Sequence, residues 1–217
     1  NCFNFAMAQA EGVVASAAKG FSIGKYTNYI EAHQGKVLAA NPEGMVMPFL
    51  SNHDMDRIGG AFILENNMRM AANLYLLCPG SPVIYYGEEI GMVGARGGEM
   101  TDANRRLAMF WGDGDTVKDP EGTTYNSGQT NGSVMDQLPN GDSLYNHYKK
   151  LILIRKANPE IANGTFQALE IPDSKLGGFL ASWEGSTVCV LHNTTSAPLQ
   201  VDLTTLGDGS LTGIAAY

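Results

Sequence analysis

Residues 45–54 read MVMPFLSNHD, and this stretch decides the fold. An apolar run leads directly into His53 and Asp54. Proline cannot donate to the hydrogen-bond ladder of a central strand, so Pro48 predicts a short strand over residues 49–51. In parallel α/β architectures the substrate binds where the strands end. The stretch therefore indicates a buried strand whose C-terminal end presents a polar pair to a ligand.

Strand and helix patterns alternate on both sides of this stretch. Strand followed by helix followed by strand is typical of parallel βαβ units. Two or three such units do not close a sheet, since a barrel of this type needs eight strands. The predicted elements are a strand ending at 3–5, helices over 6–19 and 23–33, a helix over 61–77, a buried strand over 83–86, a long loop over 94–142 and a helix over 143–156.

The pattern changes after the last of these helices. Short strand-like runs separated by turns indicate a small antiparallel β-sandwich. We expect it to pack on the helix over 143–156. The predicted boundary lies near residue 161, giving domains over 1–161 and 162–217, and we expect both to be incomplete because Asn1 opens on an apolar run and Tyr217 ends without an obvious finish. The runs cover 165–170, 179–183, 187–192 and 199–203.

Composition excludes several functional classes. The formal net charge is −8, and without a Lys/Arg cluster the chain cannot replace the counterions of a nucleic acid. No stretch is long and apolar enough to predict a membrane span. Cys2, Cys78 and Cys189 lie far apart and form no metal-ligand spacing, so we expect three buried or half-buried thiols. No metal site is predicted, and a neutral sugar fits this charge.

Four motifs, taken in order, resemble segments of the α-amylase family, and the first resembles that family's fourth signature region. The first is the Asn-His-Asp triplet after the buried strand, and the others resemble that family's last barrel strand, the segment after it and its last barrel helix. A series of motifs in one order is more specific than any isolated match. They read NHD at 52–54, PGSPVIYYGEEIGM at 79–92, DANRR at 102–106 and SLYNHYKKL at 143–151.

The resemblance implies an α/β fold: the last three strands and helices of a (β/α)8 TIM barrel, followed by an all-β antiparallel sandwich. It also implies a retaining glycoside hydrolase acting on α-glucans such as starch or malto-oligosaccharides. In that family an aspartate steadies the transition state, and Asp54 matches it. His53 matches a histidine that hydrogen-bonds the sugar. We expect further sugar contacts from Asn52, Arg57, Asn104 and Arg106.

Two other carboxyl groups are needed for a retaining mechanism, and neither has a match in this chain. The family's nucleophile lies in a G-x-R-x-D-x-x-x-H-like stretch that does not occur here. Glu88 and Glu89 match the turn after the last strand, so we interpret them as structural. The expected partner is the missing N-terminal part of the same barrel. No cofactor is predicted, although the complete enzyme could hold calcium.

Two readings from other classes remain open. A non-catalytic relative could keep the barrel as a binding or structural subunit. A metal hydrolase could use His53, Asp54 and Asp56, but the remaining histidines show no ligand spacing. Arg57 is expected to form a surface pair with Asp56 or Asp102, because surface pairing is the usual state of such charges. Preference for α-1,4 or α-1,6 bonds, and for hydrolysis or transfer, stays open.

Overall fold

The computed structural model describes residues 2–62, 64–125, 131–206, 211, 213 and 214. Its first part contains a parallel βαβ unit, as predicted. Strands β1 and β2 pair in parallel, with Phe3 opposite Met47, and Phe49 extends the arrangement through a parallel bridge to Val83. The elements here are β1 (Cys2–Asn4), the 3-10 turn η1 (Phe5–Met7), α1 (Val13–Ala18), α2 (Ile23–Ala40) and β2 (Val46–Pro48).

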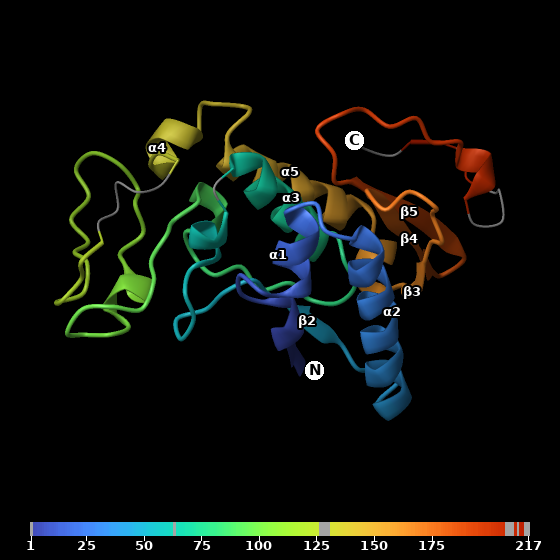
Figure 1. Cartoon of the computed structure of the whole chain (residues 1–217), viewed down its shortest axis with the longest axis horizontal. Coiled ribbons are helices and arrows are strands. Elements are labelled where there is room, and N and C mark those ends of the chain that lie inside the picture. Colours follow the sequence, from blue (N-terminus) through green and yellow to red (C-terminus); the bar gives the residue numbers. More distant parts are fainter. Residues whose placement is uncertain (1, 63, 126–130, 207–210, 212, 215–217) are drawn as a thin grey trace.

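The remaining elements run from the barrel-like part into a small sheet (Figure 1). The loop that carries η4 and α4 extends on the side away from that sheet. These elements are η2 (Ile58–Ala61), α3 (Glu65–Leu76), η3 (Glu88–Ile90), η4 (Ala103–Arg106), α4 (Val134–Gln137), α5 (Leu144–Ala157), α6 (Glu160–Asn163), β3 (Thr165–Ala168), β4 (Leu176–Trp183), β5 (Ser186–Asn193) and η6 (Leu203–Thr205).

Several helix boundaries differ from the predicted ones. The helix predicted over 6–19 is wrong in its first half, because Gln9 adopts a φ of 70° and donates its backbone N–H to the carbonyl of Leu50 at 2.9 Å. That tertiary contact replaces a helical hydrogen bond. The second helix continues past His33 to Ala40, and the third begins only at Glu65.

The strand boundaries at the centre also need correction. Strand β2 includes Pro48 and ends there, whereas the strand was predicted over 49–51. Proline lacks only the N–H, and its carbonyl still accepts a hydrogen bond from the backbone N–H of Val83 at 2.8 Å. The strand predicted over 83–86 is wrong in both extent and burial: within the described residues only the single bridge at Val83 forms, and Ile84 and Tyr86 are 36% and 39% exposed.

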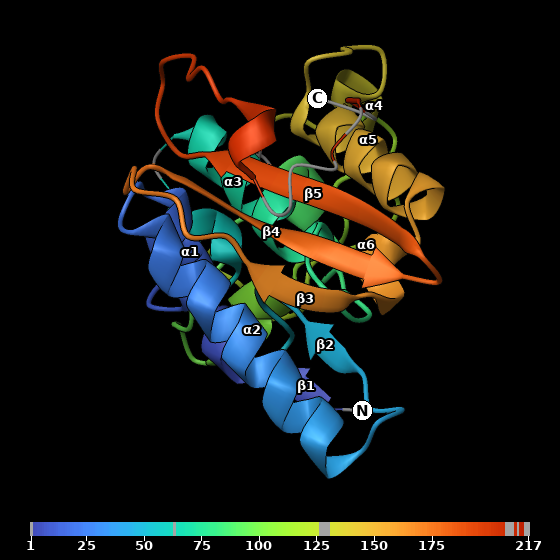
Figure 2. The ribbon, with the colours of Figure 1, turned by 90° about the vertical axis from the view of Figure 1, so that its right-hand side faces the viewer.

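Strands β3, β4 and β5 form an antiparallel sheet, as three of the four predicted runs required. The fourth, over 199–203, is wrong. Asp202 accepts a hydrogen bond from the backbone N–H of Thr204 at 3.0 Å, which starts the 3-10 turn η6 instead. A sandwich needs a second sheet packed on this one, and the described residues after 161 form only this sheet. The sheet packs chiefly on α2 and α6, and Figure 2 shows α2 along its β3 side.

One buried cluster joins the helices to this sheet. It includes Val14 of α1, Ala72 of α3, Leu151 of α5 and Phe179 of β4, so the core is continuous across the predicted boundary near residue 161. A smaller cluster under the long loop contains Ile90, Met92, Leu107 and Val134. In the described ranges, no helix combines the length and apolar character needed to cross a membrane.

The three cysteines differ in exposure. Cys78 is buried and Cys189 is half-buried, as predicted, but Cys2 is exposed. Cys2 lies in β1, whose outer edge has no strand neighbour among the described residues. All three are free thiols.

Candidate active site

The loop that follows β2 presents the predicted polar pair to solvent. His53 and Asp54 side chains are 63% and 66% exposed, and His53 Nε2 lies 3.3 Å from Asp54 Oδ2. The backbone N–H of Asp54 donates to Asn52 Oδ1 at 2.9 Å, which forms the local turn that aspartate and asparagine favour. The hydrogen bond within the triplet therefore stabilises the turn, while the imidazole of His53 and the carboxylate of Asp54 stay accessible to solvent.

Arg106 of η4 fixes this pair from across the loop. Its Nη2 lies 3.1 Å from Asp54 Oδ1, and its Nε donates to the carbonyl of His53 at 3.1 Å. An exposed pair of this kind contributes only about 0–1 kcal/mol to stability. Its effect is orientation, since one guanidinium contacts both the carboxylate and the backbone beside it. Three of the predicted site residues, His53, Asp54 and Arg106, are thus brought together.

Arg105 is a contact that the sequence interpretation missed. Its Nη1 donates to the carbonyl of Asp54 at 2.9 Å and to Asp102 Oδ1 at 2.8 Å, while its Nε donates to Asp56 Oδ1 at 2.7 Å. Burial is the largest single effect on the pKa of Asp56 and would raise it, but the hydrogen bonds and charges of Arg96 and Arg105 together outweigh burial and hold that pKa below its usual value. The adjacent arginines in the run DANRR gave no sign of which one reaches which group.

Arg57 does not form the surface pair with Asp56 or Asp102 that the sequence predicted. It is 2% exposed, and its Nη1 donates to the carbonyl of Tyr86 at 2.6 Å. Its guanidinium lies over the rings of Tyr85 and Tyr86, 4.6 and 4.7 Å from their centroids. Aromatic faces attract cations in this geometry, so Arg57 holds the loop against the segment after Val83 and does not reach solvent.

Asn104 is also placed inside the protein and not at the cleft. Its side chain is fully buried. Its Oδ1 accepts hydrogen bonds from the backbone N–H groups of Thr124 and Tyr125 at 2.8 and 3.2 Å, and its Nδ2 donates to Thr124 Oγ1 at 2.9 Å. A buried amide needs such partners. Asn104 therefore ties η4 to the long loop.

A buried carboxyl group lies directly beneath the site loop. Ser51 donates to Glu88 Oε1 at 2.6 Å, and Tyr75 donates to Glu88 Oε2 at 3.3 Å. Burial raises the pKa of Glu88 to about 8, although both hydrogen bonds act to lower it. The pKa of Glu89 is also raised, chiefly by burial. Its Oε2 accepts from the backbone N–H of Gly87 at 2.7 Å.

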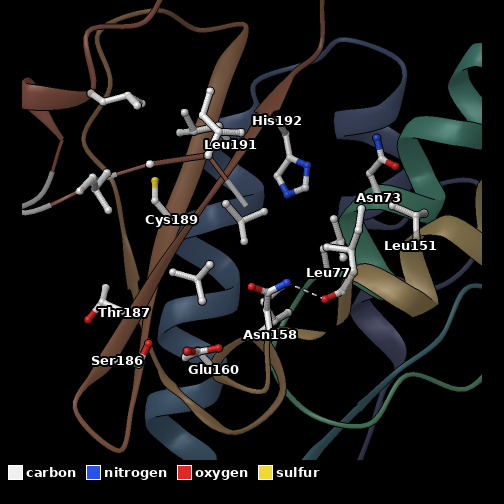
Figure 3. A pocket seen from close by; sticks show the side chains of 18 of the residues that line it. Asn73, Leu77, Leu151, Asn158, Glu160, Ser186, Thr187, Cys189, Leu191 and His192 are labelled. Carbon is white, nitrogen blue, oxygen red and sulfur yellow. Dashed lines mark hydrogen bonds between the residues drawn. The ribbon is translucent and has the colours of Figure 1, made fainter. Parts of the chain in front are cut away.

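The described part of the protein contains a small hollow beside the site loop and a larger one away from the predicted site residues. One, of about 300 Å³, adjoins the site loop and is lined by Glu11, Asp56, Arg57, Arg105 and Tyr125 among others. The larger, of about 840 Å³, lies between α5 and β5 (Figure 3). None of the predicted site residues lines the larger hollow, so its size does not identify the site.

The larger hollow has a mixed lining. Leu77 and Leu151 face it, and His192 points into it from β5 (Figure 3). Burial lowers the pKa of His192 to about 4, which keeps the ring neutral. Among the described residues, no group of three or more His, Cys, Asp or Glu side chains is arranged to hold a metal ion.

Parallel strands joined by helices, with a carboxylate and an imidazole exposed just beyond a strand end, are the arrangement expected at the active-site end of a barrel-type α/β enzyme. The chain belongs to the α-amylase family: residues 2–164 match the family model described as "Alpha amylase, catalytic domain". It is 34% identical over 155 residues to Alpha-amylase 3 of Dictyoglomus thermophilum, covering 67% of this chain and 29% of that protein.

Solved structures agree with this assignment. The chain resembles Eubacterium rectale Amy13B with a TM-score of 0.83 and 29% identity, over 94% of this chain and 41% of that one. It resembles the α-amylase from H. orenii with a TM-score of 0.76 and 33% identity, over 91% of this chain and 39% of that one. The fold is thus that of the TIM-barrel α-amylases. The chain spans well under half the length of each relative compared.

Proposed function

We propose that this chain supplies one part of the active site of a retaining glycoside hydrolase that acts on α-glucans. Asp54 is the carboxylate that stabilises the transition state, and His53 hydrogen-bonds the sugar beside it. One observation carries the proposal: the two side chains are exposed, 3.3 Å apart and beyond the end of β2. Starch and malto-oligosaccharides are the proposed substrates.

The chemistry follows from the charge that develops during glycosidic cleavage. The transition state is oxocarbenium-like, and hydrogen bonds to sugar hydroxyls strengthen as it forms. A carboxylate held in place before the reaction stabilises that charge without reorganising. Arg106 contributes by contacting Asp54 Oδ1 and the carbonyl of His53, which leaves Asp54 Oδ2 directed toward the imidazole.

The buried predicted residues take a supporting role in this proposal. Arg57 anchors the site loop to the segment after Val83, and Asn104 anchors η4 to the long loop. Neither side chain reaches solvent. Among the sugar-contact candidates we therefore keep Asn52, His53 and Arg106.

The nucleophile and the acid/base would come from the rest of the same barrel, which is the proposed partner of this chain. An apolar surface beside β1 supports that view. Phe3 and Phe5 are 52% and 60% exposed, and both rings pack edge-on against Phe49. Exposed aromatic groups of this kind mark an interaction surface. Further strands of a complete barrel, placed beside β1, would cover and bury the rings of Phe3 and Phe5.

The test is the Asp54→Asn substitution in the full-length protein that contains this chain. We expect kcat on soluble starch to fall by about a hundredfold or more, because a preorganised charge is removed from the transition state. His53→Ala should cost less and appear partly in KM. The circular dichroism spectrum serves as the folding control.

Two results would contradict the proposal. A folded Asp54→Asn protein with nearly unchanged kcat would exclude the assigned role of Asp54. A wild-type protein that binds malto-oligosaccharides but never cleaves them would instead indicate a non-catalytic binding subunit.

A further inference from the structure

A buried hydrogen-bond chain closes the site loop at its base. Ser51 Oγ donates to Glu88 Oε1 at 2.6 Å and accepts from the backbone N–H of Ile58 at 3.4 Å. Ser51 directly precedes the Asn-His-Asp triplet, and Ile58 follows the loop. One hydroxyl therefore joins the two ends of the loop that presents Asp54, and Glu88 determines where that hydroxyl lies.

Glu88 itself is held by elements outside the loop. It starts the turn η3, directly after Gly87, which adopts a φ of 88°. A Cβ at Gly87 would collide with Met92 and approach Arg57 Nη1 to 3.0 Å, so only glycine fits here. Tyr75 of α3 contacts the second carboxyl oxygen. The carboxyl group thus connects the site loop to α3 through two fixed partners.

We propose that Glu88 is a positioning residue for catalysis: through Ser51 it sets the geometry of the loop that carries His53 and Asp54. This inference rests on the proposed function of Asp54. It gives Glu88 a role in turnover although its side chain never touches the sugar. A displacement of about 1 Å caused by a change away from the reacting atoms can cost a hundredfold in rate.

The surroundings of Glu88 explain why an acid is tolerated there. It is 4% exposed, and burial is the main cause of its raised pKa. Glu89 raises the same pKa, whereas Ser51, Tyr75 and Arg57 lower it. A protonated carboxyl group keeps the carbonyl oxygen that Ser51 needs as an acceptor. Glutamine has the same oxygen at the same distance from the backbone and can replace it.

The experiment compares Glu88→Ala, Glu88→Gln and Ser51→Ala in the full-length protein, with soluble starch as substrate. We expect Glu88→Ala and Ser51→Ala each to lower kcat by about ten- to a hundredfold with little change in KM. The kcat of the double variant should be no lower than that of the slower single variant, because both substitutions remove the same hydrogen bond between Ser51 and Glu88. Glu88→Gln should retain kcat within about threefold.

A core variant separates positioning from simple loss of stability. Ile161 is buried at the start of α6, away from the site loop, and Ile161→Val lowers Tm without touching the hydrogen-bond chain. A drop in kcat for Glu88→Ala no larger than for Ile161→Val would overturn the inference. So would additive losses in the double variant, or a Glu88→Gln protein as slow as Glu88→Ala.

Wild type and Asp54→Asn are measured in the same series. If wild type does not cleave starch, or Asp54→Asn remains fully active, the proposed function fails. If both behave as expected and only the Glu88 series does not, the positioning role alone fails.

Discussion

Glu88 is a carboxyl group buried near Ser51, Tyr75, Glu89 and Arg57, and its protonation is coupled to folding. The side chain is 4% exposed, and its pKa is raised to about 8 from the ordinary 4.5. The folded protein therefore prefers the protonated acid. The stability that this preference contributes is complete below about pH 4.5 and is lost as pH rises through about 8.

The first prediction follows from that sign. Glu88→Gln is neutral at every pH, so wild type should lose stability relative to the variant between pH 5 and pH 8. The gap in unfolding free energy should widen by about 1–4 kcal/mol, because each pKa unit corresponds to about 1.4 kcal/mol. Urea unfolding at both pH values measures it. Glu43→Gln, on an exposed turn, should show no such widening, and a constant Glu88→Gln gap would contradict the prediction.

Arg105 gives a second prediction at this scale. One guanidinium contacts the carbonyl of Asp54 and the carboxylates of Asp56 and Asp102, so Arg105→Ala should release the loop and lower kcat on starch by about tenfold or more. Lysine has the charge but not the planar fork, so Arg105→Lys should recover only part of the rate.

Arg69 provides the matched control for that experiment. It also pairs with a carboxylate, Glu65 of α3, but contacts nothing in the site loop. Arg69→Ala should leave kcat unchanged. Equal losses in Arg105→Ala and Arg69→Ala would show that surface charge, and not the contact with Asp54, matters.

At the scale of elements, α5 has a defined start. Ser143 Oγ accepts from the backbone N–H of Asn146 at 3.2 Å and donates to the carbonyl of Gln137 at 2.8 Å, which connects α4 to the helix cap. Because the sequence places a serine before the apolar face of this helix, the cap was predictable.

Ser143→Ala should lower the unfolding free energy by about 1 kcal/mol, within a range of about 0.5–2 for lost N-caps. Thermal or urea unfolding measures the loss. Ser174→Ala, on an exposed turn before β4, removes a hydroxyl of the same kind without a cap and should change little. A loss below about 0.3 kcal/mol at Ser143 would mean that the cap does not limit this helix.

At the scale of the whole molecule, we predict that residues 1–217 alone do not hydrolyse starch. A retaining mechanism needs a nucleophile and an acid/base, and no carboxylate of this chain occupies a motif matching either. The exposed rings of Phe3 and Phe5 also favour aggregation, as does the edge of β1 that has no strand neighbour among the described residues. Expression of this chain alone, followed by purification and a reducing-sugar assay, tests the prediction.

Turnover that survives rigorous purification would contradict it and would place the missing carboxylates within this chain. Co-expression with the upstream part of the barrel provides the positive control, since it should restore both solubility and activity if the two parts form one enzyme.

The sequence by itself determined the family, the βαβ order, three of the four antiparallel strands predicted after residue 161 and the adjacent pair His53 and Asp54. Those features depend on the local periodicity of apolar residues and on short motifs in the sequence. It did not determine where helix 6–19 breaks or that Pro48 belongs to β2, because a contact with Leu50 and one with Val83 decide those points. Similarly, only tertiary structure separated Arg105 and Arg106, at the loop, from Arg57, inside the protein. Three arginines look alike in sequence, and their surroundings alone decide which one meets a carboxylate, a carbonyl or an aromatic face.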